Sequence, residues 1–327
     1  MTLTQLRYLV AIADSGFNIT LAAERVHATQ PGLSKQLKQL EDELGFQLFR
    51  RKGRSLLGVA PAGVKVIEHA RRILAEAANI RSYAANERGE YRGRLRLATT
   101  HTQARYVLPK VIADVTRRYP EVSVDLFVAG DAEVLAKLDE SDFALVSSAG
   151  RVPETNGLAI PLFRWQRVLL VPKTHPLARL DGPLKVADLA RYPLISYESS
   201  NQPESSLQRT FAAAGVTPQI AMTARDANLI EAYVRTGLGA GLLAEMAVGG
   251  RKDDDLRVLP APVELPECIT WAIVPRGRVL REYALTLLHA LAPQIDGRDL
   301  RNILEGNLPP LWPDPPRWQA DGATNPD

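Results

Sequence analysis

Residues 19–45 read ITLAAERVHATQPGLSKQLKQLEDELG, a pattern that predicts two short helices joined by a tight turn. Apolar side chains recur at helical spacing in the second helix, and Pro31 and Gly45 suit its first turn and its C-terminal stop. Its first turns carry hydroxyl, amide and basic groups. A protein that places one helix in the major groove of DNA needs this layout, so the segment predicts a helix-turn-helix.

The flanking residues extend this unit into a winged helix-turn-helix. Upstream, residues 3–15 have apolar side chains at helical spacing and end at Gly16. Downstream, residues 46–61 (FQLFRRKGRSLLGVAP) predict two strands around a basic tip, which is a wing. We therefore expect helices over about 3–15, 20–26 and 31–44, and an all-α DNA-binding domain with a β wing over residues 1–60.

The polar residues of this domain supply the candidate DNA contacts. Hydroxyl and amide groups can bond to base edges, and lysine and arginine mostly contact phosphate. Any one of them alone is equally consistent with a solvated surface, so the prediction depends on the group together. The candidates are Thr29, Gln30, Ser34, Lys35 and Lys38 on the recognition helix, and Arg51, Lys52 and Arg54 on the wing.

Composition supports a DNA-binding protein and excludes several other classes. Residues 1–60 hold eight Lys and Arg against five Asp and Glu, while the whole chain carries a net charge of only +3. No apolar run is long enough to cross a membrane, and no signal peptide is expected, so we predict a cytoplasmic protein without membrane contact. The lone Cys268 fits a reducing compartment and a small buried hydrophobe.

Pro61 opens a long predicted helix that ends near Glu87. Within it, apolar and small residues alternate at spacings of four and three: Val66, Ala70, Ile73, Ala77, Ile80 and Ala84. Such a heptad seam favours close approach of a partner helix, so we expect a linker and dimerisation helix over residues 61–89. The alternative is that this face packs on its own chain.

From Arg94 onward, short apolar strands alternate with helices, which predicts parallel sheets covered on both faces. A break near residue 164 suggests two α/β lobes with a cleft between them. We expect a periplasmic-binding-protein-like domain over residues 90–296, with lobe I at about 94–163 and 269–296, lobe II at about 164–268, and a tail at 297–327. The tail is rich in proline and is expected to be mostly extended or disordered, and its Trp312 and Trp318 can dock on the body or on a partner.

The chain resembles the LysR-type transcriptional regulators. The motif that carries the resemblance spans about 60 residues: Ala22-Ala23, Val26, Thr29-Gln30-Pro31, Leu33-Ser34, Leu40-Glu41, Leu44-Gly45, Leu48-Phe49-Arg50-Arg51 and Ala60-Pro61-Ala62-Gly63. Three further stretches are similar to the CysB/Cbl subgroup of cysteine and sulfur-assimilation regulators: ATTHTQARYVLP (98–109), RYPLISY (191–197) and DANLIEAYVRTGLGAG (226–241). The resemblance implies a homodimer or homotetramer that contacts RNA polymerase.

A candidate effector site lies where the strand at 94–100 ends and a helix begins. Thr99, Thr100, Thr102 and Gln103 stand at this junction, where open α/β folds bind ligands and where free amides favour an anion. The alternative is that the threonines only cap the helix. Resemblance to the subgroup implies ligand binding by Thr100, Thr102, Gln103, Ser147 and Gln202, with sulfate, thiosulfate or an acetylserine-like molecule as the effector.

Three residues depart from the subgroup pattern in this region. Ser148 replaces an acidic residue, Glu198 replaces a neutral one, and Arg225 replaces a threonine. Glu198 would repel a sulfate but could pair with an ammonium group, and Arg225 would act in the opposite direction. These two changes act in opposite directions on an anionic ligand, so the sequence leaves the identity of the effector open.

The expected function is a DNA-binding regulator of sulfur or cysteine genes. The competing class is a solute-binding protein or an enzyme, since both use two-lobed α/β folds. His101 has no nucleophile–base partner, the histidine spacing fits no metal site, and GLGAG (237–241) joins a helix to a strand, the reverse of a dinucleotide-binding turn. We therefore expect no catalysis, no metal and no cofactor. A LysR-type regulator of another pathway remains the alternative within the class.

Overall fold

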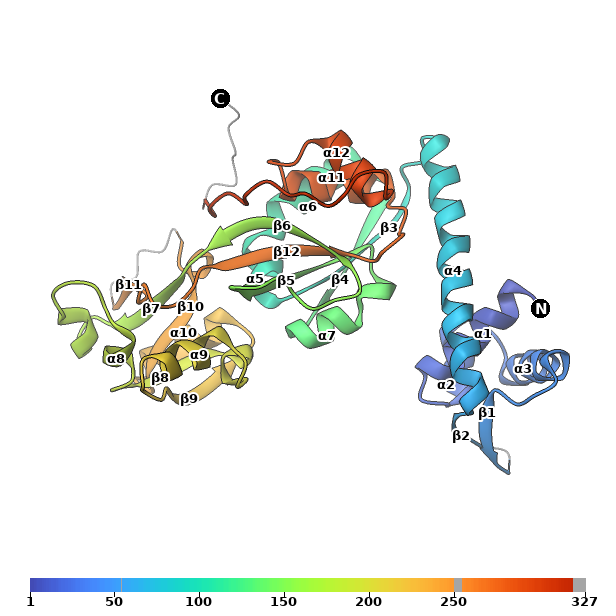
Figure 1. The fold of residues 1–327 in the computed structure, drawn as a ribbon, viewed down its shortest axis with the longest axis horizontal. Coiled ribbons are helices and arrows are strands. Elements are labelled where there is room, and N and C mark those ends of the chain that lie inside the picture. Colours follow the sequence, from blue (N-terminus) through green and yellow to red (C-terminus); the bar gives the residue numbers. More distant parts are fainter. Residues whose placement is uncertain (54, 250–254, 320–327) are drawn as a thin grey trace. The chain divides into compact units, whose positions relative to one another are not determined.

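The computed structural model describes residues 1–53, 55–249 and 255–319. It contains two compact units, Met1–Arg88 and Gly89–Asp327, each with its own core (Figure 1). In the described residues, no helix is long and apolar enough to cross a membrane.

The first unit is a winged helix-turn-helix followed by a long helix, as the sequence predicts. Its elements are α1 (Leu3–Asp14), α2 (Ile19–Arg25), α3 (Gln30–Leu44), β1 (Phe49–Lys52), β2 (Ser55–Val59) and α4 (Pro61–Glu87). Side-chain caps set the helix starts: the Asn18 side chain accepts a hydrogen bond from the Leu21 N–H, so α2 begins slightly before the expected Thr20. Gly45, in the left-handed region at φ 78°, ends α3.

The core of this unit explains why the three short helices pack together. One face of α3 is fully covered, and it meets the apolar faces of the other helices and of the wing. The buried residues of this core include Leu6, Leu9, Ile12, Leu33, Leu37, Leu40, Leu48 and Phe49. The apolar stripe of α3 is therefore used inside the unit, and, apart from the buried Glu41, its charged side chains are left on the outside.

Only the first part of the α4 seam is covered by its own chain. Ala70 is buried and Val66 packs against the core of the first unit. Further along, Ile73 is 40% exposed and Ile80 is 67% exposed. The helix therefore packs on its own domain at its start and presents exposed apolar side chains beyond it, and their coverage by a partner helix stays a prediction.

The second unit contains two five-stranded sheets. The first sheet has the order β4-β3-β5-β12-β6 and the second the order β11-β7-β10-β8-β9. The strands of the first are β3 (Gly93–Thr99), β4 (Val122–Val128), β5 (Phe143–Ala149), β6 (Leu158–Trp165) and β12 (Cys268–Val274). Those of the second are β7 (Arg167–Pro172), β8 (Pro193–Tyr197), β9 (Gln219–Ala224), β10 (Ala240–Ala244) and β11 (Leu256–Pro260).

Helices cover these sheets (Figure 1). They are α5 (His101–Tyr106), α6 (Leu108–Arg118), α7 (Asp131–Ala136), α8 (Val186–Leu189), α9 (Ser206–Ala213), α10 (Ala227–Arg235), α11 (Glu282–Leu291) and α12 (Gly297–Leu304). Short 3₁₀ turns lie at Leu138–Glu140, Pro176–Arg179, Glu198–Asn201 and Glu245–Ala247. The two sheets with their helices are the two lobes that the alternating pattern predicts.

The expectation of parallel sheets is only partly correct, because β3 pairs in parallel with β4 and β5, and β8 with β9 and β10, but other pairs are antiparallel. Strand β12 runs antiparallel to both β5 and β6, and β7 runs antiparallel to β10 and β11. The reason is the path of the chain, which leaves the first sheet at the end of β6, enters β7 after the single residue Gln166, and returns through Glu267 into β12. The chain thus crosses between the lobes twice, outward at Gln166 and back at Glu267. Because these two crossings lie side by side and run in opposite directions, the strands next to them run antiparallel.

Strands β6 and β11 were not predicted from the sequence. Pro161 interrupts β6, and proline removes a donor from the strand ladder. It is tolerated because β6 is an edge strand with an irregular register opposite Trp271. Strand β11 is also an edge strand and ends at Pro260.

Gly63 gives a test of the packing between the wing and α4. A Cβ at this position would lie 2.2 Å from the Leu48 carbonyl oxygen, although alanine normally favours a helix over glycine. We expect Gly63→Ala to destabilise the first unit by about 1–3 kcal/mol, as overpacking does. Urea unfolding is the measurement. Gly297→Ala is the matched control, because the nearest atom to its new Cβ lies 3.8 Å away; equal effects of the two substitutions would contradict the prediction.

Candidate DNA-binding and effector sites

The recognition helix α3 exposes most of the residues predicted to bind DNA. Gln30, Lys35 and Lys38 are exposed, and Ser34 is half-buried. The Thr29 hydroxyl accepts the Gly32 N–H at 3.3 Å, so this residue caps the helix while its side chain stays on the surface. Neutral donors and acceptors therefore lie at the start of α3, and the two lysines follow one and two turns later.

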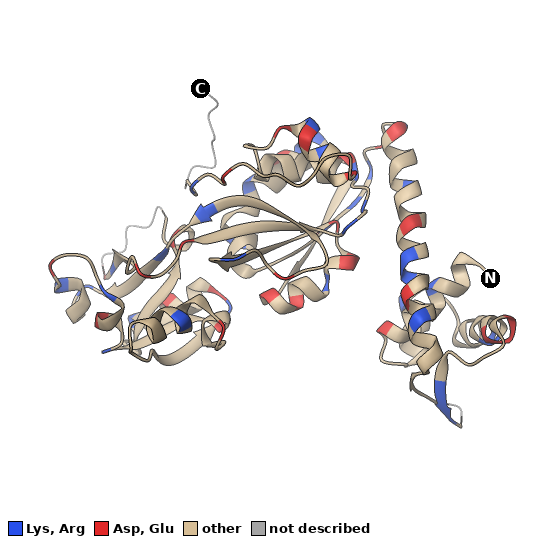
Figure 2. Cartoon of the chain, in the orientation of Figure 1, with Lys and Arg blue, Asp and Glu red and all other residues tan. Residues whose placement is uncertain are grey.

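The wing contributes a basic edge next to this helix. Figure 2 shows basic residues gathered on β1, where Lys52 is exposed. Arg51 has an internal partner: its Nη2 donates to Glu41 Oε2 at 2.7 Å, and the other oxygen of this buried carboxylate accepts the Leu48 N–H at 2.9 Å. Arg51 thereby ties the wing to α3. Arg54, the remaining candidate, lies outside the described residues.

Three of the five predicted effector residues form one hydrogen-bonded cluster in the first lobe. The Thr100 hydroxyl donates to Gln103 Oε1, and Gln103 Nε2 donates to Ser147 Oγ at 2.9 Å. Gln103 itself is buried, so its amide is the hub that orients the two hydroxyl groups. Thr100 begins α5 without a side-chain cap hydrogen bond, which argues against the purely capping role.

Two residues that sequence reasoning missed complete this cluster. Thr270 Oγ1 accepts from Gln103 Nε2 at 3.1 Å and from Trp165 Nε1 at 3.1 Å, and lies 3.2 Å from Ser147 Oγ. Thr270 is fully buried in the middle of an apolar strand. A buried hydroxyl needs a partner, and its position in CITWAIV was the signal that could have identified it.

Of the other two predicted effector residues, Thr102 bonds to the second lobe and Gln202 belongs to it. Thr102 Oγ1 donates to the Tyr197 hydroxyl at 3.4 Å, which links α5 to the end of β8 in the second lobe. The Ala244 N–H also donates to this hydroxyl, and burial raises the pKa of Tyr197. Gln202 is exposed, and the described part of the chain shows no hydrogen bond from its side chain to the other four residues.

The two charged departures from the subgroup pattern are paired with each other. Arg225 Nε lies 2.8 Å from Glu198 Oε2, and Arg225 Nη1 lies 3.0 Å from Glu133 Oε2 on α7. These partners raise the pKa of Arg225. The opposing effects that the sequence suggests for Glu198 and Arg225 therefore offset each other, and the arginine joins the second lobe to the first. Ser148 accepts from Trp271 Nε1 at 2.8 Å.

The chemistry of the cluster is that of neutral hydrogen-bond donors. Hydroxyl groups can rotate from an internal acceptor to a ligand oxygen, so Thr100, Thr102 and Ser147 can each offer a donor. The described residues contain no group of His, Cys, Asp and Glu suited to a metal ion. Cys268 is buried and its burial raises the pKa of the thiol, which disfavours a reactive thiolate.

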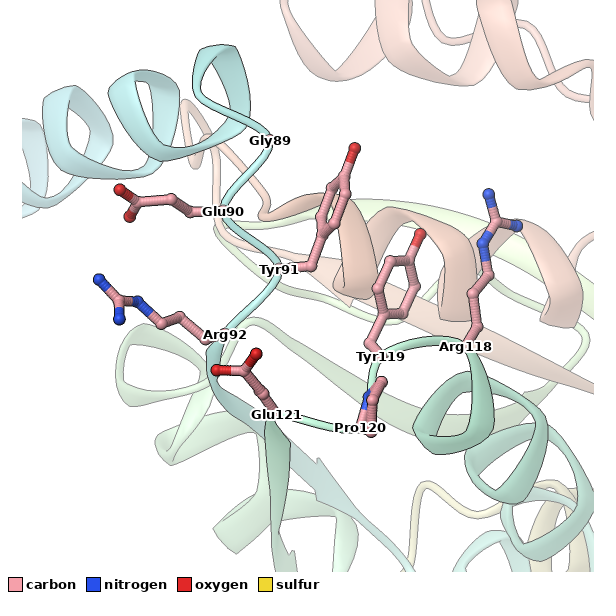
Figure 3. Close-up of a pocket in the computed structure, with 8 residues that line it drawn as sticks. All are labelled: Gly89, Glu90, Tyr91, Arg92, Arg118, Tyr119, Pro120 and Glu121. Carbon is pink, nitrogen blue, oxygen red and sulfur yellow. The ribbon is translucent and has the colours of Figure 1, made fainter.

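A separate cavity of 370 Å³ lies at the opposite edge of the first sheet (Figure 3). It is lined by Gly89–Arg92 before β3 and by Arg118–Glu121 before β4, with the rings of Tyr91 and Tyr119 5.3 Å apart. Ligands of open α/β sheets bind beyond the carboxyl ends of the strands. The hydroxyl cluster is at that edge of the sheet and this cavity is not.

Comparison with known proteins gives two family matches. Residues 3–64 match the bacterial regulatory helix-turn-helix protein, lysR family, and residues 88–296 match the LysR substrate binding domain. Together these matches cover most of the chain.

Curated relatives and a solved structure agree with these matches. The chain is 36% identical to the HTH-type transcriptional regulator CysB of Haemophilus influenzae, over 90% of this chain and 91% of that protein. It is 33% identical to the regulator Cbl of Escherichia coli, over 94% and 98% of the two chains. The crystal structure of the cofactor-binding domain of Cbl matches with a TM-score of 0.60 at 32% identity, covering 65% of this chain and 94% of that domain.

Asp131 gives a test of the electrostatics beside the cluster. Its carboxylate accepts the Ser147 backbone N–H, its Oδ1 is buried without a hydrogen-bond partner among the described residues, and burial raises its pKa to about 6. The folded protein therefore binds this proton more tightly than the unfolded chain. The resulting stabilisation is complete below pH 3.8 and is lost as the pH rises through 6.

We expect Asp131→Asn to be more stable than wild type at neutral pH, by about 1–3 kcal/mol, because the buried charge is removed. The advantage should shrink as the pH is lowered to 4. Urea unfolding followed across this pH range is the measurement. Asp125→Asn, at an exposed carboxylate of β4, is the control, and a stability difference for Asp131→Asn that does not change with pH would refute the assignment.

Proposed function

Because the chain belongs to the LysR family of transcriptional regulators, we propose that it controls sulfur-assimilation or cysteine-biosynthesis genes in response to a small effector. The observation that carries the proposal is the cluster of Thr100, Gln103 and Ser147 at the carboxyl edge of the first sheet. Its relatives CysB and Cbl are transcriptional regulators, so we assign the chain no catalytic activity.

We propose that α3 lies in the major groove of double-stranded DNA. Gln30 and Ser34 are placed to bond to base edges, and Lys35, Lys38 and Lys52 to contact phosphates. The exposure of these side chains on one element and its adjoining wing supports this role. Arg51 contributes through its bond to Glu41, which fixes the wing against the helix.

The proposed oligomer rests on the exposed apolar side chains of α4. The uncovered side chains of Ile73, Ile80 and Tyr83 on α4 give a partner helix an apolar face to cover. We propose a homodimer through α4, assembled further into a tetramer, that binds a DNA site with dyad symmetry in the cytoplasm. Contact with RNA polymerase would follow from binding near a promoter.

The effector is proposed to bind between the lobes, against Thr100, Thr102 and Ser147. Sulfate, thiosulfate and acetylserine-like molecules present oxygens that neutral hydroxyl donors can bind. Such a ligand changes the protein only through different affinities for two arrangements of the lobes. The alternative is a LysR-type regulator of another pathway with a different small anion or amino-acid-like ligand, and the genes adjacent to this one would discriminate between the two.

The DNA contacts are tested by salt dependence. We expect Lys35→Ala and Lys38→Ala each to make the slope of log K against log salt less negative by about one for each DNA-bound subunit, because each removes one phosphate contact per subunit. The measurement is retardation of a fragment from the gene's own upstream region at several salt concentrations. Lys185→Ala, at an exposed lysine of the second lobe, should leave the slope unchanged, and unchanged slopes for all three variants would reject α3 as the reading helix.

The effector site is tested by calorimetry with sulfate, thiosulfate, O-acetylserine and N-acetylserine. We expect Thr102→Ala to weaken binding of the preferred ligand about tenfold, the equivalent of one hydrogen bond. Thr217→Ala, at an exposed threonine of the second lobe, is the control. Binding by Thr102→Ala that equals wild type would remove the pocket assignment.

A further inference from the structure

Residues 315–318 form a short strand-like contact with the first sheet of the second unit. Beyond α12, the Arg164 N–H donates to the Pro316 carbonyl at 2.7 Å, and the Trp318 N–H donates to the Arg164 carbonyl at 2.7 Å. These bonds form a parallel bridge between Arg164 and Arg317. The partner is β6, the edge strand of the first sheet, so the segment covers an otherwise free strand edge.

Aromatic packing holds the segment in place. The ring of Trp318 lies 5.0 Å from that of Phe163, measured between centroids, and Pro315 is buried. Trp312 and Trp318 both pack against the core of the first lobe. The two tryptophans of the tail therefore dock on the body, which the sequence alone left undecided.

An ion pair anchors the same segment to the second chain crossing. Arg317 Nη2 lies 2.8 Å from Glu267 Oε1, and this pairing lowers the pKa of the Glu267 carboxyl. Glu267 also accepts from Gln166 Nε2 at 3.3 Å. Gln166 and Glu267 are the residues through which the chain leaves the first lobe and returns to it. The tail segment thus bonds directly to Glu267 and, through Glu267, to Gln166.

Strands β6 and β12 carry two members of the polar cluster, Trp165 and Thr270, and the tail packs on β6. Phe163, which Trp318 covers, pairs with Thr270 across the β6–β12 ladder. Two residues further along β6, the Trp165 indole donates to Thr270 Oγ1 at 3.1 Å. Thr270 in turn accepts from Gln103. A continuous set of contacts therefore runs from Trp318 to the amide that orients the candidate effector hydroxyls.

We propose that Pro315–Trp318 is a positioning element of the effector site. By fixing the end of β6 and the start of β12, it holds Trp165 and Thr270 in place behind Gln103 and restrains the two crossings between the lobes. Trp318 and Arg317 act through these residues and do not touch the ligand. The effector part of this inference depends on the proposed function, whereas the positioning of Trp165 does not.

The experiment measures the Trp165 indole proton in the full chain labelled with ¹⁵N-tryptophan. With four tryptophans in the sequence, Trp165→Phe assigns its signal. We expect Trp318→Ala to accelerate hydrogen exchange of this proton about tenfold, the equilibrium equivalent of one lost aromatic pair. Affinity for the preferred member of the calorimetric ligand panel should fall about tenfold as well. Trp318→Phe should restore both values.

Two further variants separate positioning from general stability. Arg317→Ala removes only an exposed guanidinium and its bond to Glu267, so the chain should stay folded while Trp165 exchange and ligand affinity change in the same direction, by about twofold or more. Leu311→Ala, at a residue of the same tail that is 80% exposed, should change neither. A fall in melting temperature with Trp165 exchange and affinity both at wild-type values would overturn the proposal and leave the tail as a simple edge cover.

The outcomes also separate this inference from the proposed function. If wild type binds no ligand of the panel, the proposed effector class fails, and Trp165 exchange alone still decides whether the tail positions the cluster. If wild type binds and Thr102→Ala does not, the effector site stands. Unaltered exchange and affinity in Trp318→Ala would then reject the positioning role alone.

Discussion

One antiparallel strand pair, β6 and β12, constrains the whole second unit. It carries the chain out of the first lobe and back, because Trp165 pairs with Cys268 at the point where both crossings begin. The same pair supplies the indole of Trp165 and the hydroxyl of Thr270 to the buried polar cluster. A buried hydroxyl without a partner costs free energy, so the cluster and the register of these strands stabilise one another.

The sequence predicted the first unit better than the second, for a physical reason. Helix starts and stops depend on local groups, such as the caps at Asn18 and Thr29 and the left-handed Gly45. Strand β6 depends on distant ones: Pro161 breaks its local pattern, and only pairing with β12 and its edge position allow the strand. With β6 unrecognised, Trp165 could not be assigned to the site, and Thr270 had no visible partner.

Among the candidate effector residues, too, some contacts could be predicted from the sequence and others could not. Thr100, Gln103 and Ser147 meet at the ends of β3 and β5 because these neighbouring parallel strands end at one edge, which spacing and resemblance could indicate. The pairing of Glu198 with Arg225 could not be derived, because each residue comes from a different loop of the second lobe. Arg225, near the carboxyl ends of the strands, is therefore already paired with carboxylates. The proposed site would then bind its ligand through neutral hydroxyl and amide groups.

The proposed effector site would link ligand recognition to the strands that join the two lobes. Gln103 orients the candidate donors and is itself bonded to Thr270, which lies two residues from the crossing at Cys268. If the effector binds as proposed and draws the hydroxyl groups away from Gln103, the bonds of Gln103 to Ser147 and Thr270 change with it, close to the strand ends that join the lobes. In that proposal, affinity and conformational response depend on the same few hydrogen bonds, so a substitution in this set is expected to change both.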